Sequence, residues 1–86
     1  MTLLIRGRRF KLIFGNPGGD DWGKCHYDTQ KIVVRGTLSP LNKLDTVIHE
    51  LLHAAVPDMD ETAVDETASA IAKALWRLGY RPDDGD

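Results

Sequence analysis

The feature that most constrains the fold is a pair of helical segments joined by a link of only a few residues. Ser39-Pro40 predicts the start of the first segment, because serine is a favoured N-cap and proline is well tolerated at the first helical position. The segment should end near Ala55 or Val56, because Pro57 follows and the residue before a proline avoids helical geometry. A link this short predicts that the two helices pack as an antiparallel hairpin.

The second helical segment runs from about Asp60, a favoured N-cap, to about Leu78, with Gly79 as its stop. Its apolar residues recur at steps of four, three, four and three, which predicts one continuous apolar stripe. These residues are Val64, Ala68, Ile71, Leu75 and Leu78. The apolar face of the first helix consists of Leu41, Leu44, Ile48, Leu51, Leu52 and Ala55, with His49 and His53 at its edge.

The N-terminal part of the chain carries short segments typical of strands. Residues 2–14 predict two strands, because apolar side chains alternate there with a period near two. Residues 15–24 are rich in glycine and predict a loop, and the β-branched residues within 31–35 predict a third strand. We therefore expect residues 1–86 to form one α+β domain, a three-stranded antiparallel or mixed sheet followed by the helix hairpin. Residues 83–86 are expected to form a frayed acidic tail.

Charge and cysteine content limit the classes of function. The formal net charge of -2 argues against general nucleic-acid binding. Cys25 is the single cysteine, so no disulfide can form within the chain, which suits a cytoplasmic protein. We expect Cys25 to be a small buried residue rather than a metal ligand. Neither a signal peptide nor a membrane span is visible, and the oligomeric state does not follow from the sequence.

Within the first helix, His49-Glu50-Leu51-Leu52-His53 places two histidines four residues apart, with a glutamate directly after the first. On an α-helix this step advances about 6 Å and turns about 40°, so both imidazoles leave the same side. Two neutral imidazoles at that separation can hold one zinc ion, and the glutamate can take a proton from a water bound to it. The H-E-x-x-H pattern also occurs by chance in ordinary helices, where the histidines are surface residues.

A third metal ligand is expected from the second helix, because catalytic zinc sites usually have three protein ligands. His53 lies about one turn before the first helix ends, so a residue about one turn into the antiparallel partner faces it. Glu61 is in that place and is the expected third ligand. Asp65, one turn further, is expected to accept the N–H of His49 and so fix its tautomer. Two alternatives remain: Asp65 as the direct ligand, and Glu61 in a capping box with Asp58.

Residues 49–53 (HELLH) and 61–65 (ETAVD) together resemble the zincin metallopeptidases of the gluzincin type, whose pattern is H-E-x-x-H followed by E-x-x-x-D. The resemblance implies one zinc ion on both histidines and Glu61, with Glu50 as general base and Asp65 orienting a histidine. Residues 47–80 also look like small metallopeptidases encoded by phages and prophages. In the family, the strand before the metal helix pairs with an extended peptide substrate, a role that would fall to residues 31–35.

Other residues near the predicted site each have two possible roles. His26 and Tyr27 are candidates for polarising the scissile carbonyl or stabilising the oxyanion, against ordinary roles as a loop histidine and a half-buried tyrosine. Trp22 is expected to pack, or to contact a partner from its glycine-rich loop. Asp45 lies one turn before the first histidine of the motif and is expected near the metal site.

The motifs predict zinc-dependent peptide hydrolysis, with a peptide or protein as substrate. The alternative is a non-catalytic module in which zinc staples the helix hairpin and the surface binds a host or phage protein. A closed site of four ligands would favour the module. Glu50 favours hydrolysis, because a structural zinc has no need of a base beside it.

Overall fold

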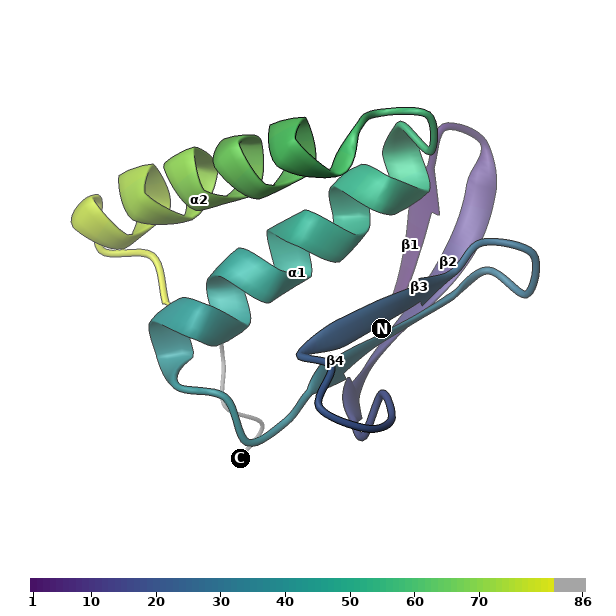
Figure 1. Ribbon diagram of the computed structural model, residues 1–86, viewed down its shortest axis with the longest axis horizontal. Coiled ribbons are helices and arrows are strands. Elements are labelled where there is room, and N and C mark those ends of the chain that lie inside the picture. The colour runs from purple at the N-terminus through teal and green to yellow at the C-terminus, as the bar shows by residue number, and fades with distance from the viewer. Residues whose placement is uncertain (82–86) are drawn as a thin grey trace.

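The computed structural model describes residues 1–81, and the predicted acidic tail lies outside them. The architecture is α+β, as predicted, with a four-stranded mixed sheet and two helices (Figure 1). The strands are β1 (Thr2–Ile5), β2 (Arg8–Gly15), β3 (Gly23–His26) and β4 (Lys31–Arg35). The helices are α1 (Pro40–Ala55) and α2 (Glu61–Arg77), and Figure 1 confirms that they run antiparallel. Among the described residues, no helix is long and apolar enough to cross a membrane.

Strand β3 was not predicted, because residues 15–24 were expected to be a loop and no strand was expected between residues 15 and 30. The strand is only four residues long and has no β-branched side chain. It forms because its backbone pairs antiparallel with β4, with Gly23 opposite Val34 and His26 opposite Lys31. Pairing with β4 therefore stabilises a strand that its own sequence does not predict.

The strand order β1-β2-β4-β3 overturns the expected role of residues 31–35. Strand β4 pairs in parallel with β2 on one side and antiparallel with β3 on the other. Both of its edges are therefore hydrogen-bonded within the sheet, and it cannot take up a further strand. The free edges belong to β1 and β3.

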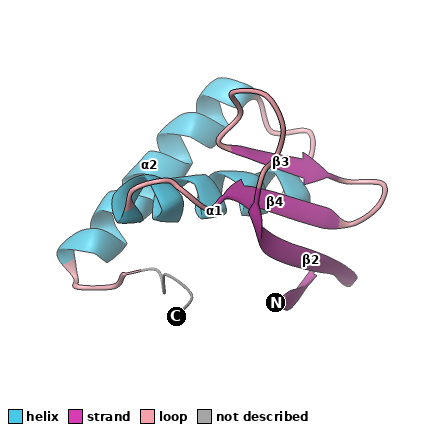
Figure 2. Cartoon of the chain, turned by 90° about the horizontal axis from the view of Figure 1, so that it is seen from below, coloured by secondary structure: helices cyan, strands magenta, loops and turns pink. Residues whose placement is uncertain are grey.

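Both helices lie on the same side of the sheet, and α1 is the one that packs against it (Figures 1 and 2). The core between α1 and the sheet consists of Phe10, Leu12, Ile32, Val34 and Ala54. The side of α1 that faces this core also buries three polar side chains, Lys43, Thr46 and Glu50, each 6% exposed. The apolar face predicted for α1 is only partly buried.

The apolar stripe predicted for α2 is wrong at two positions. Its buried residues are Val64, Ala68 and Ala72, whereas Ile71 is 39% exposed and Leu78 is 73% exposed. Helix α2 packs on α1, and two of its three buried residues are alanines. Small side chains let the helix backbones approach closely, which leaves the larger residues at the margin of the contact.

The link between the helices sets where α2 begins. Asp60 is the N-cap, as predicted, and its carboxylate accepts a hydrogen bond of 2.8 Å from the Ala63 backbone N–H. Ser39 is the N-cap of α1 but forms no side-chain hydrogen bond there. The Arg6 guanidinium donates to the Ala55 carbonyl at 2.9 Å, which places a cation at the C-terminal end of α1.

Candidate metal centre

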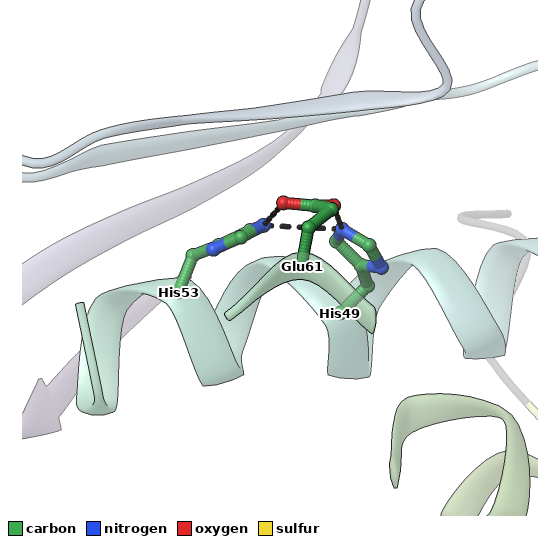
Figure 3. A group of neighbouring side chains, drawn as sticks. All are labelled: His49, His53 and Glu61. Atoms are coloured by element: carbon green, nitrogen blue, oxygen red, sulfur yellow. Dashed lines mark hydrogen bonds and ion pairs between the residues drawn. The ribbon is translucent and has the colours of Figure 1, made fainter. Parts of the chain in front are cut away.

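Helix α1 positions the first two predicted ligands one turn apart on the same side. The Nε2 atoms of His49 and His53 lie 3.1 Å apart, and the two side chains are 20% and 26% exposed. Both rings face the start of α2 (Figure 3). Each imidazole thus offers one nitrogen to a common point at the helix surface.

Glu61, the first residue of α2, completes the group (Figure 3). Its Oε1 lies 3.0 Å from Nε2 of His49, and its Oε2 lies 3.3 Å from Nε2 of His53. The three side chains each offer a ligand atom within 4.8 Å of the others, so the group could hold a metal ion. Because Asp60 is the N-cap, the alternative capping box between Asp58 and Glu61 does not form.

Asp65 lies one turn beyond Glu61 and faces His49 from the other side of the imidazole ring. Its Oδ1 is 3.2 Å from Nδ1 of His49. A carboxylate in this position can accept the Nδ1–H, which would leave the lone pair of Nε2 facing His53 and Glu61. Within the described residues, Asp65 is not a member of the three-residue ligand group.

Glu50 is buried between α1 and the sheet, directly beside the ligand group. Burial raises the pKa of its carboxyl from 4.5 to about 7, an effect opposed by His53 and reinforced by the charge of Glu61. No hydrogen bond to its carboxylate comes from residues 1–81, although the side chain is only 6% exposed. A buried carboxyl that titrates near neutral pH is suited to exchanging protons.

Strand β3 approaches Glu50 so closely that residue 23 must be glycine. A Cβ atom added at Gly23 would lie 2.7 Å from Cγ2 of Thr46 and 3.0 Å from Oε2 of Glu50. With a larger residue, Thr46, Glu50 or the strand would therefore have to shift. Sequence reasoning missed this residue, because Gly23 resembled one more glycine in a loop.

A cavity of about 420 Å³ lies between β3 and the metal centre. The three ligand residues and Glu50 line one side of it, and Gly23, Lys24 and Cys25 line the other. The site is therefore open on the side of the free sheet edge.

No family model, curated protein or solved structure matches this chain significantly. A function for this chain therefore has to be inferred from the geometry and chemistry of this site.

The structure separates the two residues that the sequence suggested for the oxyanion. Tyr27 lines the cavity, with its ring 4.2 Å from the Arg8 guanidinium and 5.9 Å from the Phe10 ring centroid. His26 is not among the described residues that line it. Strand alternation sends the His26 side chain to the opposite face of the sheet from Cys25.

Cys25 lines the cavity as well, but its chemistry differs from that of the ligands. Burial, together with a smaller effect of the charge of Glu50, raises the pKa of its thiol to about 11. Among the described residues, Cys25 is not a member of the group that could hold a metal ion, and it is half-buried rather than buried as expected.

Proposed function

We propose that this chain is a minimal zinc-dependent peptide hydrolase of the gluzincin type. His49, His53 and Glu61 would hold the zinc ion, because two imidazole nitrogens and one carboxylate form a donor set typical of catalytic zinc. Ligands about 2.1 Å from a tetrahedral ion lie about 3.4 Å apart, and the nitrogen and oxygen contacts here are 3.0–3.3 Å. When bound, zinc acidifies a water molecule and polarises a carbonyl group.

The observation that carries the proposal is the environment of Glu50. The residue is only 6% exposed, no hydrogen bond to its carboxylate comes from the described residues, and it lines the same cavity as the three ligands. In the proposed reaction, Glu50 takes a proton from the attacking water and delivers it to the leaving amine. Asp65 holds the His49 ring in one tautomer through its contact with Nδ1.

The free edge of β3 is the place where we propose that an extended peptide binds. This edge faces away from β4, and Lys24 and Cys25 of the strand line the cavity. Backbone pairing with β3 would hold the peptide as a fifth strand, with its scissile bond beside Glu50. Strand β3 thus takes the role that the sequence resemblance gave to residues 31–35.

A second candidate function is supported by the position of Glu61 at the start of α2. Helix α2 packs on α1, so a metal ion shared by the two helices would staple the hairpin together. In that case the domain is a zinc-stabilised interaction module for another protein, and the cavity has no catalytic role.

The substitution Glu50→Gln separates the two functions. We expect the zinc-loaded protein to cleave members of a mixed peptide library, with the products detected by mass spectrometry. A chelator should abolish this cleavage. Glu50→Gln should lower the rate by roughly 10²- to 10⁴-fold, the usual contribution of a general base, and retain one zinc per chain. The matched control is Glu66→Gln, because Glu66 is exposed on α2. Zinc binding without cleavage by the unmodified chain would favour the module.

A further inference from the structure

A second cavity, of about 340 Å³, adjoins the metal centre toward the start of α1. It shares Gly23, His49 and Glu50 with the first cavity. The residues that belong to it alone are Trp22, Asp45, Thr46 and Asp65. A substrate side chain next to a scissile bond held beside Glu50 could therefore enter it.

Besides Glu50, two carboxylates line this second cavity and give it a negative character. Asp65 contributes one, although its Oδ1 is already in contact with Nδ1 of His49. Asp45 contributes the other, and it has no hydrogen-bond or ion-pair partner within residues 1–81. Lys73 influences Asp45 electrostatically but forms no ion pair with it in this part of the chain. Besides His49, the residues that line the cavity include no basic side chain.

Trp22 adds a feature that an acidic cluster alone lacks. The residue is 51% exposed, so its indole is accessible to a ligand. Its backbone is fixed, because the Trp22 carbonyl accepts a hydrogen bond of 2.7 Å from the Arg35 N–H. An indole held beside carboxylates attracts cations to its face.

Glu50 links this cavity to the reaction proposed above. The residue is 6% exposed and lines both cavities, and its carboxylate has no hydrogen-bond partner among the described residues. A peptide that presents its scissile bond to Glu50 therefore places an adjacent side chain at Trp22 and Asp45.

We infer that the second cavity binds the lysine or arginine side chain of a peptide substrate, with the indole of Trp22 against the cation and Asp45 as its counter-ion. The inference rests on the proposed function, because it names the class of substrate that the site takes. Indole contact and charge pairing both discriminate against neutral and acidic side chains at this position.

The test compares peptides that differ only in the residue next to the scissile bond, which is lysine, arginine, norleucine or glutamate. We expect kcat/KM for the cationic peptides to exceed that for norleucine by roughly tenfold or more, and the ratio to fall with added salt. Asp45→Asn and Trp22→Ala should each reduce the ratio toward one. Asp28→Asn is the matched control, because Asp28 is exposed in a turn and lines neither cavity, so it should preserve the ratio.

A binding measurement distinguishes failure of this inference from failure of the proposed function. The zinc-loaded Glu50→Gln variant is titrated calorimetrically with the same peptides, and the cationic ones should bind roughly tenfold more tightly. Cleavage without a preference, together with equal binding, would overturn the inference and leave hydrolysis standing. Preferential binding without cleavage by the unmodified chain would support the cation site and overturn hydrolysis.

Discussion

Helix α1 lies between the sheet and α2, whereas α2 packs on α1 (Figure 1). The side of α1 toward the core holds long polar side chains that the sheet covers, including Lys43 and Glu50. The buried side of α2 consists of Val64, Ala68 and Ala72. The metal centre takes His49 and His53 from the better supported helix and one carboxylate from the other. This contrast teaches that the histidine pair is fixed by the fold, while the third donor depends on how α2 is held.

The largest expected effect comes from removing a donor on α1. His53→Ala should lower zinc affinity by more than the roughly 10- to 100-fold lost when a residue that only supports a ligand is changed. Zinc should then no longer raise the melting temperature, because its binding to the native state would be too weak. Isothermal titration and thermal melts measure both effects. His26→Ala, which changes a histidine outside the cavity, should behave like the unmodified chain.

Overpacking the helix contact tests whether α2 is the weakly held element. Ala68 is fully buried, so Ala68→Leu should destabilise the protein by about 1–3 kcal/mol in denaturant melts. It should also weaken zinc binding, because moving α2 moves Glu61. The same substitution at Ala70, which is exposed on α2, should change neither quantity. Unchanged zinc affinity in a destabilised Ala68→Leu protein would contradict the proposed dependence.

A smaller loss of zinc affinity is expected when the contact between Asp65 of α2 and Nδ1 of His49 is removed. Asp65→Asn removes the carboxylate 3.2 Å from Nδ1 and should lower zinc affinity by roughly 10- to 100-fold. The fold should remain, because Asp65 is exposed. Competition against a zinc-chelating dye measures the affinity, with Asp28→Asn as the control. An affinity equal to that of the control would show that Asp65 does not support the ligand.

The smallest effect concerns the pH dependence of the metal-free protein. Burial raises the Glu50 pKa from 4.5 to about 7, so between these values the folded chain binds a proton that the unfolded chain has lost. The free energy of unfolding should therefore fall as pH rises from 4.5 to 7, by about 1–2 kcal/mol after solvent screening. Chemical denaturation at several pH values measures this change. Glu50→Gln should remove this contribution to the pH dependence of the free energy of unfolding. If the pH dependence does not change in the variant, other groups cause it.

Local signals were sufficient to predict the helices and the grouping of the candidate ligands. Ser39-Pro40 and Asp60 mark the helix starts, and a short link between long periodic segments leaves one arrangement for the pair. The position of Glu61 beside the two histidines could therefore be predicted from the helices alone, without the sheet.

The missed features depend on contacts between distant parts of the chain. Strand β3 is stabilised by pairing with β4, and Gly23 is required because Thr46 lies against it. The second cavity likewise joins Trp22 to Asp45 across the space between a loop and a helix. The exposure of Ile71 depends on how closely α2 approaches α1, which periodicity along one helix does not specify.

Strand β1 has a consequence for the behaviour of the protein at high concentration. It is an edge strand of sequence TLLI, with Leu4 71% exposed and no charge or proline within the strand. Such an edge is a template for association between copies, because no charge or proline on it opposes backbone pairing. Aggregation should therefore begin at β1, and Leu4→Lys should raise the concentration at which light scattering appears while leaving zinc binding unchanged.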